Sequence, residues 1–579
     1  MSPMRDAHAR RLGKSPFPSL RRILPAAAAV LALLLAGTGC QTRPTPPDRA
    51  SMPVFPTDPE AVELLKSPIL DIHTHNFNAR DIPVRNIALA RRDSLWLAWV
   101  PDGMADLLAA AILAETPPED PNLRAAHRRK TPEVRARDAA DLLGLDQGLT
   151  NTITSRAQFG AIQKLLAHHF KTGTNAPPTF GERWVLRSLS AVASGRTDGF
   201  LRRDINEVLE ELADFVSDLT LSPEELAGRY HQENSTNVQF RIAHMMDMGP
   251  TYGMDERSGG EMVPYRAQIQ QMARLANNPS NQMAYFVAYN PFRDNLHPGE
   301  ALETVRHAIE REGAVGVKIY PPAGYRAGSN QIPPRPCCPF TPAPGRQWDR
   351  RYTRSGVRLP GAELDGRVLE LLRWCATNQI PVFAHSGYGE FQARSGYGQD
   401  MPNPAWWRSV LTNHSELKDL RLCFGHSGGG DSWFGATNFA SWSDVVVDLC
   451  RTYPNVYCEV GCLSGILDAT QRRVFAVEMK RLCGLGTNQA HPFAFSSKIL
   501  YGSDWFMPIE GLSSRRQPFC EWFQSVFLET GLREHYQKFF LQNALSYLNV
   551  GQRLTDGNHP LAAETRRQLS QLAEVASRE

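Results

Sequence analysis

Length, composition and charge exclude two broad classes of protein. The chain has 579 residues, of which 42% are hydrophobic and 21% charged, and its formal net charge is +3 at pH 7. No apolar run of about 20 residues occurs outside the N-terminal region, which excludes a multi-pass membrane protein. Basic residues are interleaved with acidic residues instead of forming a basic stripe, so we expect no nucleic-acid partner.

Residues 1–40 have the pattern of a targeting segment. Two arginine pairs precede an apolar stretch over residues 23–35, which is too short to span a bilayer, and small residues precede Cys40. We predict a cleaved signal peptide of the bacterial lipoprotein type, with Cys40 lipidated. Simple secretion is the alternative, because Gly37 stands where that pattern usually has leucine. Residues 41–58, rich in Pro and Thr, would be a flexible linker, and the exported protein would face the periplasm or cell surface, contacting the membrane only through its lipid.

The nine remaining cysteines show no CxxC pair and no Cys/His spacing of a structural zinc module. Cys337 and Cys338 lie in a Pro-rich loop, where export would permit a disulfide to a partner that the sequence does not identify. Four others lie in or beside apolar runs and are expected to be buried small hydrophobic residues: Cys423, Cys450, Cys458 and Cys462.

Short apolar runs that end in polar residues recur along the chain and predict strands. Amphipathic helical patterns separate several of them, for example the apolar face formed by Leu364, Val368, Leu371, Leu372 and Cys375. This alternation predicts a parallel α/β protein, and eight units predict a closed (β/α)8 TIM barrel, with an open doubly wound sheet as the alternative. The predicted strands are 69–75, 238–244, 284–290, 314–320, 381–385, 420–426, 456–460 and 499–504.

Two insertions interrupt the barrel, which we place at residues 59–548. Residues 82–235 are rich in Arg and Ala, show helical periodicity between Ile205 and Phe215, and predict a helical cap. Residues 326–360 are dominated by Pro, Gly and Arg and predict a long loop after the fourth strand. Both leave from carboxyl ends of strands, so they should shape substrate access. The polar segment 549–579 is expected to be a peripheral C-terminal tail.

The first predicted strand ends with two histidines that have the spacing of a metal-binding pair. Residues two apart on a strand point to the same face, so His73 and His75 can present both imidazoles to one metal ion. His385, His426 and Asp504 each end a later predicted strand. The alternatives are that His426 is a core residue and that Asp504 caps a helix.

This order of residues resembles the amidohydrolase superfamily, and specifically the amidohydrolase-related branch that includes aminocarboxymuconate semialdehyde decarboxylase. That family carries HxH on strand 1, histidines on strands 5 and 6, and aspartate on strand 8, and all five positions match. The resemblance covers roughly residues 69–548 without the two insertions. Further matching segments are Phe424-Gly425-His426-Ser427-Gly428-Gly429, Asn455-Val456-Tyr457, Leu500-Tyr501-Gly502-Ser503-Asp504-Trp505 and Asn543-Ala544-Leu545.

Three imidazoles and a carboxylate around an open position are typical of a catalytic metal site. The predicted ligands of this site are His73, His75, His385 and Asp504, with His426 as a possible further ligand. A bound divalent metal lowers the pKa of its water to about 7 and so supplies hydroxide at neutral pH. Asp504 would be both a ligand and the proton shuttle, and His426 would bind that water or stabilise negative charge on the substrate. The resemblance implies zinc, with manganese and iron as alternatives, and we expect one ion per chain.

Lys318 ends the fourth predicted strand, where some superfamily members, dihydroorotases among them, use a carbamylated lysine to bridge two metals. If that modification occurs here, His73, His75 and Asp504 would hold one ion, and His385 and His426 the other. An unmodified Lys318 that pairs with a charge or contacts substrate is the alternative.

Other polar residues near the predicted site have weaker assignments. His244 is expected to be a packing or hydrogen-bonding residue, and the run Gly428–Gly430 is expected to be a turn, because no P-loop lysine accompanies it. Four residues adjacent to the site in sequence are predicted to contact substrate, with Arg326 favouring an acidic group: Tyr320, Arg326, Tyr388 and Trp505.

We therefore predict a metal-dependent hydrolase that cleaves a carbon–nitrogen or ester/lactone bond of a small molecule through metal-bound hydroxide. A non-oxidative decarboxylase with the same ligands is the nearest alternative, because the pocket and not the metal ligands decides the chemistry. A catalytically inactive, surface-tethered binding protein is a further alternative, although its expected mark, the loss of a ligand, is absent. The sequence identifies neither the substrate nor the oligomeric state.

Overall fold

The structure is a computed structural model that describes residues 53–87, 102–118, 120–143, 215–234, 237–254, 262–332, 361–388, 391–393, 397–435, 441–507, 517–555 and 561–578. The predicted signal peptide, the lipidation site Cys40 and most of the predicted linker lie outside these residues. So do Cys337, Cys338 and parts of both predicted insertions. The assignments made for those segments stay predictions.

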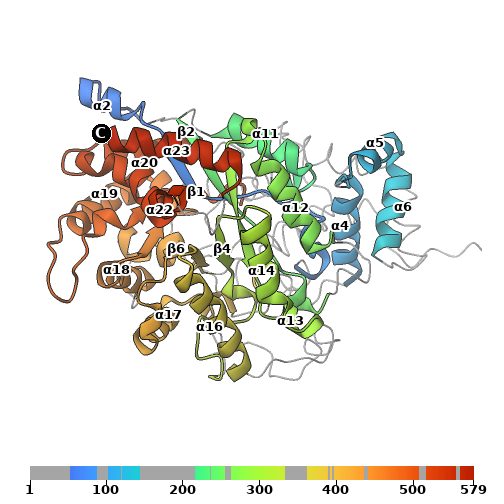
Figure 1. The fold of residues 1–579 in the computed structure, drawn as a ribbon. Coiled ribbons are helices and arrows are strands. Elements are labelled where there is room, and N and C mark those ends of the chain that lie inside the picture. The colour runs from blue at the N-terminus through green and yellow to red at the C-terminus, as the bar shows by residue number, and fades with distance from the viewer. Residues whose placement is uncertain are drawn as a thin grey trace, which may run out of the picture.

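Eight parallel strands, paired in the order β1 to β8, form the predicted barrel (Figure 1). All neighbouring pairs are parallel, and nearly every strand residue is buried, as expected where helices cover the outside of a sheet. The strands are β1 (Ile69–His75), β2 (Val238–His244), β3 (Met283–Tyr289), β4 (Gly316–Ile319), β5 (Val382–His385), β6 (Leu422–Gly425), β7 (Val456–Glu459) and β8 (Ile499–Leu500).

The segment after β8 meets β1 and brings the sheet close to full closure. The backbone N–H of Ile72 donates to the carbonyl oxygen of Tyr501 over 3.2 Å, and that of Asp504 donates to the carbonyl oxygen of His73 over 2.7 Å. A bridge between Thr74 and Trp505 continues this contact in parallel sense. The last and first strands therefore lie side by side, and the open doubly wound alternative is wrong.

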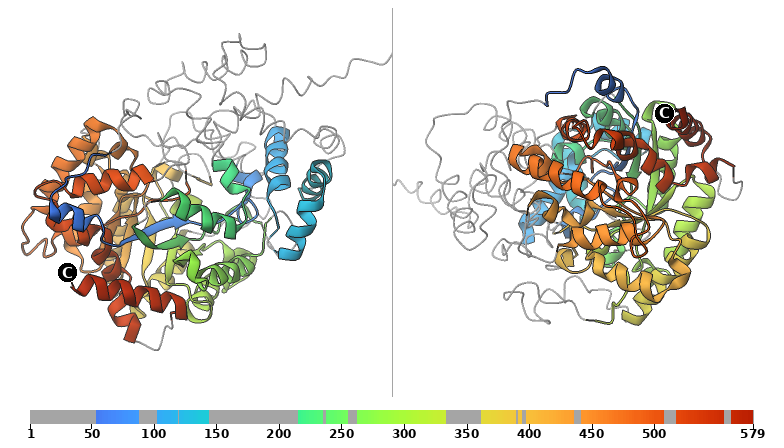
Figure 2. Two further views of the ribbon diagram at one scale, coloured as in Figure 1. Left: turned by 90° about the horizontal axis from the view of Figure 1, so that it is seen from above. Right: turned by 90° about the vertical axis from the view of Figure 1, so that its left-hand side faces the viewer.

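Helices follow the strands and surround the barrel, as the three views show (Figures 1 and 2). The predicted apolar face of α16 is buried at all five positions named above. Side-chain caps fix several helix starts, for example Asn403, Ser441 and Asp468. These helices are α2 (Pro59–Leu64), α12 (Tyr265–Ala276), α13 (Arg293–Leu296), α14 (Glu300–Arg311), α16 (Gly361–Thr377), α17 (Pro404–Asn413), α18 (Trp442–Thr452), α19 (Ala469–Cys483), α20 (Gln517–Phe527) and α21 (Asn543–Tyr547).

The described part of the first insertion is helical, as predicted. It contains α4 (Asp102–Glu115), α5 (Pro121–Arg129), α6 (Pro132–Leu142) and α11 (Pro223–Glu233), and α4 to α6 lie at one side of the barrel (Figure 2). Arg124 of α5 pairs with Glu224 of α11 at 2.7 Å, which ties the two ends of the insertion together. Of the periodic residues predicted at 205–215, only Phe215 is described, and it stacks on Phe391 and Phe506.

The C-terminal segment differs from the prediction of a peripheral tail. It forms α22 (Val550–Thr555) and α23 (Ala563–Arg578), and Leu569 and Leu572 of α23 are buried. They belong to the apolar cluster that fills one end of the barrel with strand residues such as Leu70 and Phe240. The amphipathic spacing of α23 explains the difference, because one buried stripe of apolar side chains suffices to close the barrel end.

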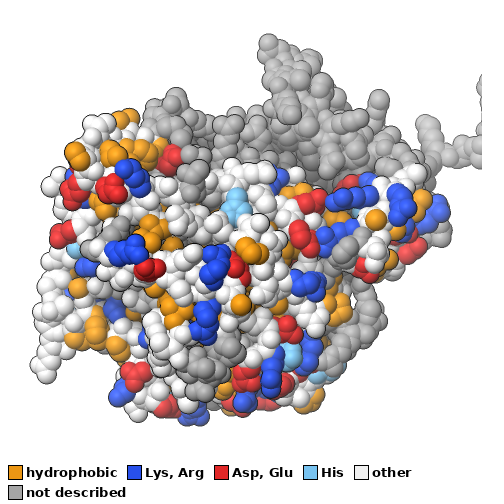
Figure 3. Space-filling view, turned by 45° about the horizontal axis from the view of Figure 1, so that its top comes forward, with side chains coloured by type: hydrophobic (Ala, Val, Ile, Leu, Met, Phe, Trp, Pro, Cys, Tyr) orange, Lys and Arg blue, Asp and Glu red, His pale blue; other side chains and the backbone are white. Residues whose placement is uncertain are grey.

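The surface carries no concentration of one charge among the side chains coloured in Figure 3, where basic and acidic groups are interspersed. Among the described residues, no helix combines the length and the apolar character needed to cross a membrane.

Candidate metal centre

The structure places the five predicted ligands in one buried cluster at the carboxyl ends of the strands. Nε2 of His73 and Nε2 of His75 lie 3.0 and 3.1 Å from Oδ1 of Asp504. Nε2 of His426 lies 3.1 Å from Nδ1 of His385, and the ring centroids of His73 and His426 are 5.2 Å apart. Strands β1 and β5 and the segments that follow β6 and β8 thus bring these side chains to one end of the barrel, where barrel enzymes build their sites.

Hydrogen bonds at Nδ1 fix the orientation of two of these imidazoles. Nδ1 of His75 lies 2.9 Å from the carbonyl oxygen of His244, and Nδ1 of His426 lies 2.9 Å from the carbonyl oxygen of Gly461. A carbonyl oxygen only accepts hydrogen bonds, so each Nδ1 carries the proton and each Nε2 keeps its lone pair. Both rings therefore present Nε2 as the atom able to bind a metal.

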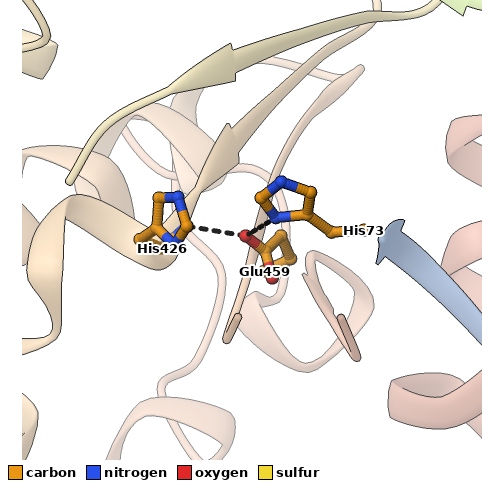
Figure 4. Close-up of side chains that lie close together, drawn as sticks. All are labelled: His73, His426 and Glu459. Atoms are coloured by element: carbon orange, nitrogen blue, oxygen red, sulfur yellow. Dashed lines mark hydrogen bonds and ion pairs between the residues drawn. The ribbon is translucent and has the colours of Figure 1, made fainter. Parts of the chain in front are cut away.

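Glu459, to which the sequence pattern assigned no role, anchors the third imidazole. Its Oε1 lies 3.0 Å from Nδ1 of His73 and also accepts the backbone N–H of His426 over 2.7 Å (Figure 4). Its Oε2 accepts the backbone N–H of Gly461. A carboxylate inside the apolar run of β7 was the signal that would have identified it, since such a residue is rarely buried without a specific partner.

The backbone leaves the strand conformation at the site residues. His426 and Asp504 have φ values of 61° and 56°, in the left-handed region that non-glycine residues rarely adopt. Both were predicted as the last residues of strands, whereas β6 ends at Gly425 and β8 at Leu500. Such conformations persist where the surrounding structure imposes them, and they cluster at functional sites.

The donor set fits a divalent cation. Oδ1 of Asp504 faces two imidazoles, while Oδ2 is buried and has no hydrogen-bond partner within the described part of the chain. A buried carboxylate oxygen without a partner is costly unless a cation completes its surroundings. Three sets of donor atoms lie within 4.8 Å of one another: His73, His75 and Asp504; His73, His426 and Glu459; and His426, Cys462 and Asp504.

Lys318 of β4 also reaches the cluster. Its Nζ lies 3.1 Å from Nε2 of His73 and 4.4 Å from the centroid of the Phe383 ring. With Nδ1 of His73 turned to Glu459, Nε2 is the acceptor for the lysine. The fourth strand therefore supplies a side chain at the position where the resemblance expected one.

The protonation states suit cation binding at neutral pH. Burial, together with the nearby charge of Lys318, lowers the pKa of His73 well below its ordinary value, and burial does the same for the pKa of His385. Burial raises the pKa of Asp504, but its contacts with His75, His426 and Lys318 outweigh this and hold it at about 2. Neutral imidazoles and an ionised carboxylate are the forms that bind metal.

Two of the four residues predicted to contact substrate lie close to the cluster or to its loops. The ring of Tyr320 lies 4.7 Å from that of His385, centroid to centroid. Tyr388 stacks on Trp442 at 4.1 Å, beside the glycine run that follows β6. Tyr320 is therefore the better placed of the two to contact a bound molecule.

Arg326 and Trp505 have structural contacts instead. The Arg326 guanidinium is buried, pairs with Asp400 and lies 4.3 Å from the ring centroid of Trp406. The Trp505 indole is buried and donates from Nε1 to Glu233 of α11 over 2.9 Å. Both predictions followed from proximity in sequence, which does not reveal where a loop side chain points. The assignment of Arg326 to an acidic substrate group is corrected accordingly.

The structure agrees with the two assignments of a non-catalytic role. Nε2 of His244 lies 2.9 Å from the carbonyl oxygen of Ile72, and its ring stacks on Phe286 at 4.9 Å. Gly428, Gly429 and Gly430 have φ values of 70°, 89° and 69°, which form a left-handed turn. Neither His244 nor the glycine run belongs to the sets of candidate metal-donor atoms given above.

Cys462 departs from the prediction that it is a buried hydrophobic residue. Among the described cysteines it is partly exposed while the others are buried, and its φ of 59° is left-handed. It follows β7 by three residues, in the loop that also holds Gly461. Sequence pattern alone does not distinguish it from Cys458, because both lie in or beside the same apolar run.

The fold and this cluster define a class of protein, the (β/α)8 barrels with a candidate metal centre at the carboxyl ends of their strands. The chain belongs to the amidohydrolase family, whose model matches residues 215–545. The resemblance stated from the sequence is thereby confirmed. The match begins after β1, so the placement of His73 and His75 in the cluster comes from the structure.

Several solved structures are similar to this chain. A 5-carboxyvanillate decarboxylase from Sphingomonas paucimobilis shares 12% identity, with a TM-score of 0.33 over 67% of this chain and 96% of that one. A manganese-bound 5-carboxyvanillate decarboxylase from Novosphingobium aromaticivorans shares 10% identity, with a TM-score of 0.34 over 67% and 92%. A protein from Lactobacillus casei, described as a metal-dependent hydrolase, shares 14% identity, with a TM-score of 0.32 over 87% and 99%. No curated protein matches the chain.

Proposed function

We propose that this protein is a metal-dependent hydrolase that cleaves a carbon–nitrogen or ester/lactone bond of a small molecule. The observation that carries the proposal is the Asp504 carboxylate, with Oδ1 between two imidazoles and Oδ2 buried without a hydrogen bond from any described residue. His73, His75 and Asp504 would hold a divalent ion, with His385 and His426 beside it. Zinc is the ion we propose, because imidazole and carboxylate donors with an open position suit it.

A divalent ion bound here would act as a Lewis acid that activates water and polarises the scissile bond. The residues of the chain supply the rest of the chemistry. Asp504 is ionised at neutral pH, since its pKa is held at about 2, and it accepts a proton at Oδ2, the oxygen that faces neither His73 nor His75. His426, whose Nδ1 is fixed by the Gly461 carbonyl, directs Nε2 into the cluster and orients the reacting group. Burial of the cluster keeps bulk water away from these charges and so strengthens their effect.

Metal analysis of the purified protein tests the site directly. We expect at least one zinc ion per chain in the wild type, loss of zinc in His73→Ala and Asp504→Asn, and retention in His414→Ala, a partly exposed histidine paired with Glu416 outside the cluster. Each variant is checked for folding by circular dichroism. A folded wild type that takes up no divalent metal would exclude the proposal and favour a binding protein on a barrel scaffold.

Product analysis separates hydrolysis from decarboxylation, which would use the same donor set. The zinc-loaded protein is incubated with panels of amides, lactones, esters and aromatic carboxylic acids, with Asp504→Asn as the matched inactive control. Uptake of a water oxygen from labelled water supports hydrolysis. Release of carbon dioxide from a carboxylic acid, without such uptake, would replace this proposal by a decarboxylase.

We also propose that the protein is exported and anchored by a lipid on Cys40. The support is the N-terminal pattern alone, in which small residues directly precede that cysteine. Expression in a bacterial host should place the wild type in the membrane fraction and Cys40→Ala in the soluble periplasmic fraction. Equal distribution of the two proteins would leave simple secretion as the better account.

A further inference from the structure

Cys462 lies where the loop after β7 meets the Asp504 segment after β8. A Cβ added at its neighbour Gly461 would lie 3.1 Å from Cβ of Asp504, so this loop packs directly on the aspartate. Among the described cysteines, Cys462 alone is partly exposed. Cys462 is therefore a partly exposed residue close to the candidate metal centre.

The thiol completes a donor set that differs from the first one. One donor atom each from Cys462, His426 and Asp504 lie within 4.8 Å of one another. Nδ1 of His426 carries its proton toward the Gly461 carbonyl, so Nε2 is the donor atom on this side. Oδ1 of Asp504 faces His73 and His75, while Oδ2 is buried and has no hydrogen bond among the described residues, so the first set does not use all the donor atoms of this carboxylate.

We propose that Cys462 is a metal ligand and that, with His426 and Asp504, it forms a second cation position beside the first, which shares Asp504 with it. The proposal rests on the proposed function for the role of Asp504 and goes beyond it in assigning a thiolate ligand. On binding, the sulfur–hydrogen bond breaks, the sulfur keeps the electron pair that it donates to the ion, and the proton passes to solvent. A thiolate makes this position selective for thiophilic ions such as zinc and cadmium over manganese and magnesium.

Cobalt(II) titration of the full protein tests the assignment with a spectroscopic readout. Cobalt replaces zinc in such sites, and a thiolate ligand adds a sulfur-to-cobalt charge-transfer band in the near ultraviolet. We expect this band in the wild type, with two cobalt ions bound per chain. We expect Cys462→Ser to lose the band and bind one ion, and Cys483→Ser, a buried cysteine at the end of α19, to keep both.

The outcomes separate failure of this inference from failure of the proposed function. A charge-transfer band that persists in Cys462→Ser, or cobalt binding by the wild type without such a band, overturns the ligand role of Cys462 and leaves the proposed function in place. A wild type that binds no cobalt overturns both. If Cys462→Ser fails to fold, alkylation of the wild type is measured by peptide mass mapping: zinc should protect Cys462 at least tenfold if it is a ligand, and unchanged alkylation would contradict the proposal.

Discussion

Oε1 of Glu459 lies 3.0 Å from Nδ1 of His73, and both side chains are completely buried. This contact joins β7 to β1 across the end of the barrel and fixes the tautomer of His73, because the carboxylate accepts the Nδ1 proton and leaves Nε2 able to coordinate. The same oxygen accepts the backbone N–H of His426. One carboxylate therefore positions two of the candidate ligands.

Replacement of Glu459 by glutamine should weaken metal binding without unfolding the protein. The amide keeps the size of the side chain but loses the charge that supports the imidazole, so we expect affinity for zinc to fall roughly 10- to 100-fold. Competition with a chelating dye measures the dissociation constant. Glu529→Gln, which removes a partly exposed carboxylate paired with Lys480, is the matched control and should leave the affinity unchanged. Wild-type affinity in Glu459→Gln would show that His73 does not depend on this contact.

Gly502 makes room for the Glu459 carboxylate and should not tolerate a side chain. A Cβ at this position would lie 2.5 Å from Oε2 of Glu459 and 2.9 Å from Cβ of His73. We expect Gly502→Ala to lower the free energy of unfolding by about 1–3 kcal/mol and to reduce metal content, because the carboxylate must move. Urea unfolding and metal analysis measure the two effects.

Gly228 provides the control for this substitution. It lies in α11, and a Cβ added there would have no neighbouring atom within 4 Å, so Gly228→Ala should stabilise the protein by about 0.5–1 kcal/mol. Similar unfolding curves for the two variants would mean that the space around Gly502 is larger than the structure indicates.

Residue types and their order along the chain were sufficient to predict the barrel and the five candidate ligands. Buried parallel strands produce apolar runs, and strand ends mark one face of a barrel, so His73, His385 and Asp504 could be assigned to a common site from their positions in the sequence. The side chains that contact these candidate ligands could not be assigned in this way. Glu459 and Cys462 lie in and after an apolar run, and only the structure shows that Glu459 contacts His73 and His426 and that Cys462 lies near Asp504.

The direction of side chains in the loops could not be predicted from the sequence either. Arg326 and Trp505 follow strands closely in sequence, but the structure directs one toward Asp400 and the other toward Glu233. Direction in an irregular segment depends on contacts with distant parts of the chain, which periodicity does not encode. The C-terminal helix α23 was predicted to be a peripheral tail because its segment is mostly polar. One stripe of apolar side chains is nevertheless enough for a helix to close a barrel end.

Stability of the metal-free protein should fall as the pH drops below 6.5. Burial lowers the pKa values of His73, His244 and His385 well below this value, so the unfolded chain binds protons that the folded chain does not. Their contribution is present above pH 6.5 and is lost as the pH falls. Each group contributes about 1.4 kcal/mol per pH unit below that point.

Two buried carboxyl groups act in the opposite direction. Burial raises the pKa of Glu459 to about 7 and that of Asp71 to about 6, so the folded state keeps these protons and gains stability as the pH falls through these values. Three imidazoles outweigh two carboxyl groups, and we expect a net loss of about 1–2 kcal/mol between pH 7.5 and 5.5. Urea unfolding of the chelator-treated protein at these pH values measures it, and a midpoint that rises toward low pH would contradict the neutral imidazoles.

Substitutions of Tyr320 and Arg326 should differ in their effects: the first should lower substrate turnover, and the second should lower the stability of the fold. Tyr320→Phe removes the hydroxyl of a ring that lies 4.7 Å from the His385 ring, centroid to centroid, and should lower kcat/KM roughly tenfold with metal content unchanged, the size expected for one hydrogen bond to a bound molecule. Arg326→Met leaves Asp400 buried without its partner and should lower the free energy of unfolding by about 3–5 kcal/mol. The double variant Arg326→Met/Asp400→Leu should recover most of that loss, because no unpaired charge remains. If Arg326→Met instead raises KM for acidic substrates while unfolding is unchanged, the guanidinium binds substrate as its sequence position suggested.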